Sequence, residues 1–278
     1  MKTTTKPAPS AEALTSRFTL ARTLAEEAGD MALDYFRRRS ELEIEAKRGM
    51  QDVVSIADRN VETFIRQRLE EAFPEDGILG EEHGLQQGIS GFTWAVDPID
   101  GTNAFVNGLP YWCVSIALLE KGEPVIGVIR LPCDGETFAA LDGAGATLNG
   151  EPLHLDPART LQTGLTGIGA NNKVPPAMIG NLIAGLLEAG GNYVRTGSAA
   201  QMLAFVAAGR VTGFFEPELN AWDCLAGYCL VKEAGGLCRP FPAEGDALLK
   251  PAPVLAAGPG AFGELSKLTE ACLSARYD

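Results

Sequence analysis

The chain has 278 residues, of which 46% are hydrophobic and 21% charged, a composition typical of a folded globular protein and not of a disordered or fibrous one. Its 36 acidic and 23 basic residues give a formal net charge of -13 at pH 7, which would repel the phosphate backbone of a nucleic acid. We therefore expect no direct binding to nucleic acid.

The cysteines indicate neither a zinc site nor a disulfide framework. None of the six has CxxC spacing, and only two histidines could complete a soft-metal site. Residues 1–10 are polar and lack the apolar stretch of a secretory signal, so we expect a flexible tail there. The longest apolar run, Trp112–Leu119, is too short to cross a membrane. These features predict a cytoplasmic protein that does not bind membranes.

Two amphipathic helices are expected in the first part of the folded chain. Apolar residues recur at helical spacing from Ala11 to Arg39, and Ser10 is placed to cap this helix. A second helical pattern runs from about Ile56 to Phe73, where Pro74 ends it.

Short β-rich runs follow, and turn formers such as Asn107-Gly108 and Asp134-Gly135 separate them. An antiparallel sheet is the simplest interpretation of this region. The expected strands are Ile78–Gly80, Phe92–Val96, Trp112–Leu119, Val125–Arg130 and Thr137–Leu141.

Helical and strand patterns alternate in the rest of the chain. Helical segments that flank sheets in both halves predict stacked helix and sheet layers, an α/β (α+β) fold. With no repeat or low-complexity linker, residues 11–278 are expected to form one domain with subdomains of roughly 11–150 and 151–278. The expected helices are Ala177–Glu188, Ser198–Ala208, Trp222–Ala234 and Gly260–Leu273, and the expected strands are Gly213–Glu216 and Val254–Ala257.

The strongest functional signal is Asp97-Pro98-Ile99-Asp100-Gly101-Thr102, which follows a hydrophobic strand. A strand end can aim both carboxylates at one point, and Gly101 lets the backbone approach an anion where the next helix begins. Hard cations such as Mg²⁺ prefer carboxylate and carbonyl oxygens and usually share a phosphate of the substrate. A simple β-turn is the alternative, because Asp-Pro and Asp-Gly are common turn formers. The complete segment favours a metal and phosphate site.

Three further acidic positions could join this site. Glu81 follows a short apolar run, Asp58 lies at the start of the second helix, and Asp223 lies at the start of a later helix. Each alone is more typical of a helix cap or a solvated surface group, and only the fold can bring them together. His83 and His154 receive no catalytic role.

The segment from Trp94 to Asn107, with Phe105 in it, resembles the signature of the inositol monophosphatase family of lithium-sensitive, magnesium-dependent phosphatases. Gly80-Glu81-Glu82 lies upstream of it, and Arg195–Ala200 and Trp222–Gly236 lie downstream, all in the family's order. The resemblance covers nearly the whole chain after the first dozen residues. It implies the layered α-β-α-β-α sandwich of the sugar-phosphatase superfamily, a homodimer, and hydrolysis of a small phosphate monoester.

The resemblance also implies roles for individual residues. Glu81, Asp97 and the carbonyl of Ile99 would hold one Mg²⁺ ion, Asp97, Asp100 and Asp223 would hold a second, and Glu81 would reach a weaker third position. Glu81, Thr102 and Asp58 would orient the attacking water, and the amides of Gly101 and Thr102 would bind the phosphate. The substrate-binding set would be Asp100, Gly101, Thr102, Gly197, Ser198, Ala199, Glu216 and Asp223.

Two residues depart from the family's pattern. Asn103 stands where the family commonly has a second threonine, and Leu225 stands where it has a small residue. Neither replaces an implied metal ligand. Leu225 could crowd the helix that carries Asp223 and so weaken the second metal position or reshape the pocket.

The identity of the substrate stays open at this point. Gly197–Ala200 and Glu216 resemble a pocket for inositol monophosphate or a similar polyol phosphate more than one for histidinol phosphate, while other sugar and nucleotide phosphates are alternatives. A non-enzymatic, RNA-polymerase-associated regulator and a cation-binding domain without turnover are different classes of function. The intact carboxylates favour catalysis, because a scaffold has no need of clustered charges that repel one another without metal.

Overall fold

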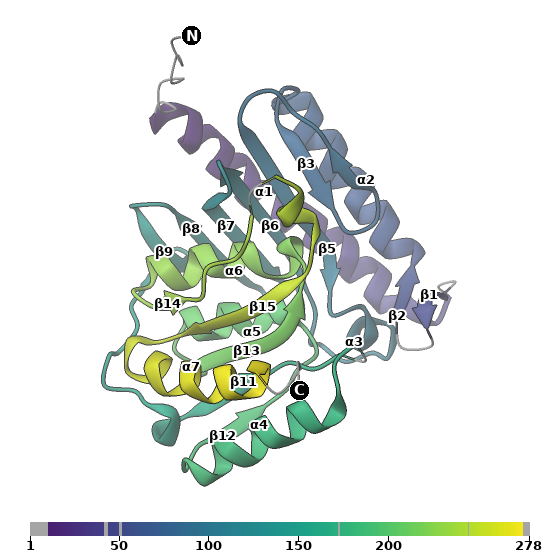
Figure 1. The fold of residues 1–278 in the computed structure, drawn as a ribbon. Coiled ribbons are helices and arrows are strands. Elements are labelled where there is room, and N and C mark those ends of the chain that lie inside the picture. The colour runs from purple at the N-terminus through teal and green to yellow at the C-terminus, as the bar shows by residue number, and fades with distance from the viewer. Residues whose placement is uncertain (1–10, 42–43, 50–51, 172, 244, 275–278) are drawn as a thin grey trace.

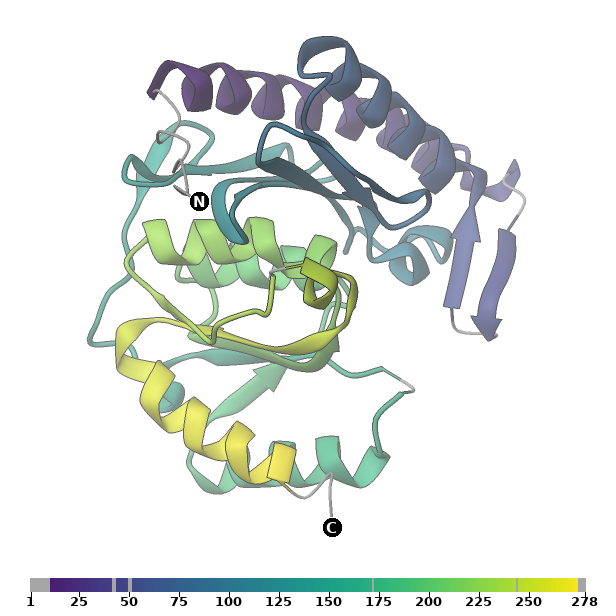
Figure 2. The ribbon, with the colours of Figure 1, turned by 45° about the horizontal axis from the view of Figure 1, so that its top comes forward.

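Layers of helices and sheets alternate through the molecule (Figures 1 and 2). The computed structural model describes residues 11–41, 44–49, 52–171, 173–243 and 245–274, so the expected N-terminal tail and the cap at Ser10 lie outside the described residues. One helix pair covers the outer face of a large sheet, a second pair lies between this sheet and a smaller one, and a third covers the smaller sheet (Figure 2). The expected α-β-α-β-α sandwich is confirmed. The pairs are, in order, α1 (Ala11–Arg37) with α2 (Ile56–Ala72), α5 (Ala199–Ala207) with α6 (Ala221–Glu233), and α4 (Pro176–Glu188) with α7 (Pro259–Ser274).

The large sheet has eight strands in the order β10-β9-β8-β7-β6-β5-β3-β4. All neighbouring pairs are antiparallel except β3 and β5. After β3 the chain turns back and pairs with β3 as β4, the strand at the edge of the sheet. It then crosses β3 to begin β5, which pairs with the other side of β3. The strands are β3 (Gly77–Gly80), β4 (Gly84–Gln86), β5 (Phe92–Asp100), β6 (Cys113–Glu120), β7 (Glu123–Leu131), β8 (Glu136–Leu141), β9 (Gly145–Leu148) and β10 (Glu151–Leu153).

The expectation of a wholly antiparallel sheet is therefore wrong for one pair, and this pair positions two acidic residues. Gly80 lies opposite Val96 in parallel register. Because parallel strands end at the same edge of a sheet, Glu81 and Asp97 leave that edge side by side. An antiparallel pair would have placed them at opposite ends of the strands.

The smaller sheet has the order β12-β11-β13-β15-β14. β11 runs parallel to β12 and β13, whereas β15 runs antiparallel to β13 and β14. Only β13 and β15 were predicted, because the other strands have two to four residues and no clear alternation. The hairpin of β1 (Ile44–Gly49) and β2 (Asp52–Ser55) was not predicted either. The strands of the smaller sheet are β11 (Leu165–Ile168), β12 (Asn192–Val194), β13 (Gly213–Leu219), β14 (Leu237–Cys238) and β15 (Ala252–Ala257).

The largest apolar cluster surrounds α5 and α6 between the two sheets. Most side chains of α6 are buried all round the helix, as expected for a helix covered on both sides. The two helices approach closely at Gly227, where a Cβ atom would lie only 2.3 Å from the Cβ of Leu203. No helix in the described part of the chain is both long and apolar enough to cross a membrane.

Candidate functional site

Asp97 and Asp100 point to the same side of β5 because the strand is bulged between them. In a regular strand, residues three positions apart face opposite sides of the sheet. Here Asp97 pairs with Ser115 and Asp100 with Cys113, so β5 holds one residue more than β6 between these pairs. Such a bulge redirects the side chain that follows it. The amide of Ile99 donates to Asp97 Oδ1 at 3.0 Å and helps to fix this turn of the chain.

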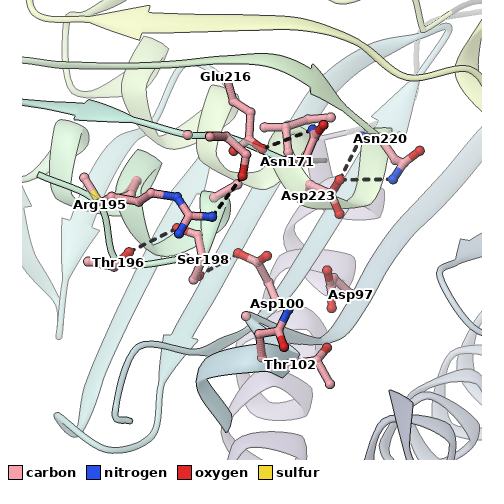
Figure 3. A pocket seen from close by; sticks show the side chains of 18 of the residues that line it. Asp97, Asp100, Thr102, Asn171, Arg195, Thr196, Ser198, Glu216, Asn220 and Asp223 are labelled. Atoms are coloured by element: carbon pink, nitrogen blue, oxygen red, sulfur yellow. Dashed lines mark hydrogen bonds between the residues drawn. The ribbon is translucent and has the colours of Figure 1, made fainter. Parts of the chain in front are cut away.

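Asp223 reaches the same place from the first turn of α6. Its Oδ2 accepts hydrogen bonds from the backbone amide of Asn220 at 2.7 Å and from Asn220 Nδ2 at 3.2 Å. One carboxylate oxygen from each of Asp97, Asp100 and Asp223 lies within 4.8 Å of the other two. Figure 3 shows the three side chains converging from the strand end and from α6.

Burial raises the pKa values of these acids, and for Asp97 and Asp223 the neighbouring negative charges add to the effect. Burial raises the pKa of Asp97 well above its ordinary value, and the negative charge of Glu81 is the next cause. Burial also raises the pKa of Asp100 to about 6. The pKa of Asp223 is raised by burial and by the charges of Asp100 and Glu81. Within the described residues, Asp97, Asp100 and Asp223 form no ion pair with lysine or arginine.

This donor set suits a hard divalent cation. The cluster offers only oxygen atoms, and Asp97 and Asp100 are 2% and 8% exposed, so their charges are poorly solvated. Glu81 and Ile99 line the same cavity, whose volume is about 470 Å³. A divalent ion would supply the positive charge that the described side chains around Asp97 do not provide.

Thr102 links this cluster to helix α2. It begins the short helix α3 (Thr102–Val106), and its Oγ1 lies 3.2 Å from Asp58 Oδ1 and 3.1 Å from the carbonyl oxygen of Ile99. The hydroxyl has one hydrogen and donates to one of these acceptors at a time. Asp58 is 1% exposed and does not line the cavity, so it lies behind Thr102, and its charge also contributes to the raised pKa of Asp97.

Gly101 occupies a position that only glycine fits. Its φ of +97° lies in the left-handed region, and a Cβ atom there would lie 2.5 Å from the carbonyl oxygen of Tyr111. We expect Gly101→Ala to lower the free energy of unfolding by more than the roughly 1–2 kcal/mol of the backbone conformation alone, since the backbone must also move. Urea unfolding measures this loss.

The control for that experiment is Gly135→Ala. Gly135 has a φ of +69° in the turn between β7 and β8, and nothing lies within 4 Å of the position of its Cβ. This variant carries the conformational cost without the clash. Equal losses for the two variants would show that the contact with Tyr111 is unimportant.

The N-terminus of α5 holds Asp100 from the other side of the cavity. Asp100 Oδ2 accepts from Ser198 Oγ and from the amide of Ala200, both at 2.6 Å. These bonds oppose the rise in the pKa of Asp100 because they favour the charged form. Gly197, with a φ of +99°, turns the chain into this helix, and Gly197, Ser198 and Ala199 line the cavity.

The far wall of the cavity consists of Glu216 on β13 and a loop after β11. Burial raises the pKa of Glu216 to about 7, and the charge of Asp100 adds to this effect, while Arg195 lowers it. Asn171 Nδ2 donates to the backbone oxygen of Glu218 at 3.1 Å and lies 3.5 Å from Glu216 Oε1. Arg195 donates to the carbonyl of Ala170 at 2.9 Å (Figure 3).

Comparison with known proteins is consistent with this arrangement. A sequence profile described as the inositol monophosphatase family matches residues 14–275. The chain belongs to the inositol monophosphatase family. It is 35% identical over 257 residues, 91% of this chain and 96% of the relative, to Nus factor SuhB from Haemophilus influenzae.

Solved structures of similar proteins share the fold. The extragenic suppressor protein suhB from Bartonella henselae is 31% identical and superposes with a TM-score of 0.84 over 91% of this chain and 98% of that one. An inositol monophosphatase (IMPase) from Thermotoga maritima is 29% identical, with a TM-score of 0.82 over 94% of this chain and 99% of that one.

The two departures from the pattern of the inositol monophosphatase family lie in different places. Leu225 is 1% exposed and packs in the cluster between the sheets, and it does not line the cavity, so no contact with the pocket supports the expected reshaping. Asn103 does line the cavity. His83 Nε2 lies 3.2 Å from Thr63 Oγ1 and is not part of the lining either.

Sequence reasoning missed several cavity residues. Asn171, Lys173 and Asn220 line the cavity but belong to loops without a motif, and Arg195 was noted only as part of a family segment. The one local signal was at Asn220, whose place before Trp222-Asp223 suits a helix cap. All predicted site residues except Asp58 line the single cavity described here.

Proposed function

We propose that this protein is a magnesium-dependent phosphatase that hydrolyses a small phosphate monoester, with inositol monophosphate or a similar polyol phosphate as its substrate. The observation that carries the proposal is the convergence of Asp97, Asp100 and Asp223 at the edge of a cavity that Glu81, Gly101 and Thr102 also line. A cluster of buried carboxylates with raised pKa values is a costly arrangement that cation binding would relieve.

Five groups would hold two to three Mg²⁺ ions, namely the carboxylates of Glu81, Asp97, Asp100 and Asp223 and the carbonyl of Ile99. When bound, the ions neutralise charge on the phosphate and lower the pKa of the attacking water. The amides of Gly101 and Thr102 would bind the phosphate oxygens where α3 begins.

Thr102 and Asp58 would orient the attacking water. When Thr102 donates its hydroxyl hydrogen to Asp58, the lone pairs of Oγ1 are free to accept a hydrogen bond from water in the cavity. Glu81 lines the same cavity and would accept a second hydrogen bond from that water. Two acceptors fix which lone pair of the water faces the phosphorus atom.

The substrate's hydroxyl groups would meet Glu216, Asp223 and the segment Gly197–Ala199. These groups line the part of the cavity around Asp100 and the N-terminus of α5. They offer carboxylate, hydroxyl and backbone groups, which match a ring or chain that carries several hydroxyls. We place the enzyme in the cytoplasm as a homodimer, and light scattering of the purified protein tests the dimer.

The decisive experiment is a phosphate-release panel with and without Mg²⁺. Inositol monophosphate should be hydrolysed faster than histidinol phosphate, fructose bisphosphate or a nucleoside monophosphate, and chelation should abolish the activity. A preference for histidinol phosphate would overturn the substrate assignment. No release from any member at saturating Mg²⁺ would overturn the proposed phosphatase itself.

A second candidate is a non-enzymatic regulator that associates with RNA polymerase. The relative from Haemophilus influenzae is named a Nus factor, and this name supports the alternative. The net charge of -13 disfavours direct RNA contact but not contact with a protein. Normal cellular function of an Asp97→Asn variant that has lost phosphatase activity would favour the regulator.

Glu216→Gln should weaken substrate binding and leave the chemical step nearly intact. At about pH 8.5, where a carboxyl with a pKa of about 7 is ionised, a hydrogen bond from a substrate hydroxyl to the charged carboxylate contributes roughly 1.5–3 kcal/mol, so KM for inositol monophosphate should rise about 10-fold or more. We expect kcat to change little. Steady-state kinetics with p-nitrophenyl phosphate, which has no polyol hydroxyls, is the control and should show no rise in KM. A fall in kcat with both substrates would instead assign Glu216 to the reaction centre.

A further inference from the structure

A completely buried carboxylate on α2 holds the turn that carries Glu81. Glu62 has no solvent exposure. Its Oε2 accepts from the backbone amide of Glu82 at 2.7 Å, and its Oε1 accepts from the backbone amide of His83 at 3.1 Å. The side chain of Glu62 therefore binds the two residues that directly follow Glu81.

Arg66, one turn further along α2, completes this contact. Its Nε donates to Glu62 Oε1 at 2.8 Å, and its Nη2 donates to the carbonyl oxygen of Gly84. The pair thus attaches both the start and the end of the turn between β3 and β4 to one helix. A buried carboxylate that is paired and accepts two amides is well satisfied, so this turn is held in one geometry.

Gly80 shows how closely the carboxylate of Glu62 approaches the turn. A Cβ atom at Gly80 would lie 2.1 Å from Glu62 Oε1, so only glycine leaves room for this contact. The close approach occurs one residue before Glu81 and at the end of β3.

Helix α2 therefore contacts the segments that follow both β3 and β5, the two strands that end at the site. Asp58 lies one helical turn before Glu62 and contacts Thr102 after β5, while Glu62 contacts the turn after β3. Residues four positions apart lie on the same face of a helix. One face of α2 thus contacts both the turn that follows β3, which carries Glu81, and the segment that follows β5, which carries Asp97.

We propose that Glu62, paired with Arg66, is a positioning residue that fixes the carboxylate of Glu81 for binding divalent cations in the cavity. The inference rests on the proposed function, because it takes Glu81 as a metal ligand. Glu62 does not line the cavity, so it acts through the turn and not by contact with the ion or the substrate.

The test is Mg²⁺ binding by the metal-free protein, measured by calorimetry with magnesium chloride alone. Glu62→Gln keeps the shape of the side chain but replaces one acceptor oxygen by an NH₂ group, which must then face a backbone amide or Arg66 Nε. Loss of an outer partner of a metal ligand typically weakens binding 10–100-fold, and we expect a loss of about that size.

The matched control is Asp76→Asn at the other end of β3. Asp76 is 3% exposed and accepts from Arg17 Nε and Nη2, both at 2.8 Å, so the variant also disturbs a buried ion pair. It should lower the thermal midpoint and leave the Mg²⁺ affinity unchanged.

If Glu62→Gln does not fold, a second variant tests the same contact. Arg66→Lys keeps the positive charge but loses the hydrogen bond from Arg66 Nε to Glu62, and it should also weaken Mg²⁺ binding.

The outcomes separate this proposal from the proposed function. If the parent protein does not bind Mg²⁺, the proposed function fails. If the parent binds Mg²⁺ and a folded Glu62→Gln or Arg66→Lys variant binds it equally well, the positioning role is wrong. Equal weakening by Asp76→Asn would show a general loss of stability and would also overturn the role of Glu62.

Discussion

Asp97→Asn should lower phosphatase turnover by at least about 10³-fold, because charge stabilisation by a metal ion contributes several kcal/mol to the transition state. The same change should make the metal-free protein more stable. Asp97 is buried, and its pKa is raised by burial and by Glu81, Asp100, Asp223 and Asp58. Asparagine removes this repulsion and can still accept the hydrogen bond from the amide of Ile99.

The two effects of Asp97→Asn are measured separately, by phosphate release at saturating Mg²⁺ and by thermal unfolding in EDTA. Asp76→Asn is the control, since it makes the same chemical change in a buried aspartate that is paired with Arg17. Breaking a buried pair costs about 3–5 kcal/mol, so this variant should lose stability. A lower thermal midpoint for metal-free Asp97→Asn would contradict the view that the cost of burying a repelled negative charge dominates at this position.

The strand-end motif could be predicted from the sequence because its information is local. A hydrophobic strand, two aspartates and a glycine at a tight turn lie between Phe92 and Gly101, and in the structure they form β5 and the residue that follows it. Helices with strong apolar periodicity, such as α1 and α2, were predicted for the same reason. These features depend on neighbours in the chain.

The convergence of Glu81 and Asp97 could not be derived from local patterns. It depends on the parallel pairing of β3 with β5, although the strands along this part of the sequence suggested antiparallel neighbours. The convergence of Asp97 with Asp100 depends on a bulge that redirects one side chain. Parallel pairing and bulges depend on the packing of the whole sheet. No residue pattern at Ile78–Gly80 predicts the parallel pairing.

Glu62 illustrates a second limit of prediction from the sequence. On the helical pattern of α2 it appears as one of several charged residues, and such residues usually lie on a solvated face. In the structure it is fully buried, because the turn after β3 covers it and supplies backbone amides. Only the tertiary contact distinguishes Glu62 from an ordinary surface acid.

The stability of the metal-free protein should fall as the pH rises from about 5.5 to 8. An acid whose pKa is higher in the folded state binds more protons there than in the unfolded chain. The resulting stability is fully present below the unfolded pKa and is lost as the pH passes the folded pKa. For Glu216, with an ordinary value of 4.5 and a folded value of about 7, about 2 kcal/mol of the loss falls between pH 5.5 and 8. For Asp100, with an ordinary value of 3.8 and a folded value of about 6, most of the loss of about 3 kcal/mol occurs between about pH 4 and pH 6, and about 1 kcal/mol of it falls above pH 5.5.

Mg²⁺ should remove most of this pH dependence, because the cation replaces the protons that the folded acids otherwise retain. Urea unfolding at several pH values, in EDTA and in saturating Mg²⁺, measures both trends. The stabilisation by Mg²⁺ should be larger at pH 8 than at pH 5.5, and calorimetry in buffers of different ionisation enthalpy should detect proton release on binding. Metal-free stability that stays constant or rises over this range would mean that the pKa values of the buried acids in the cavity are not raised in the folded protein.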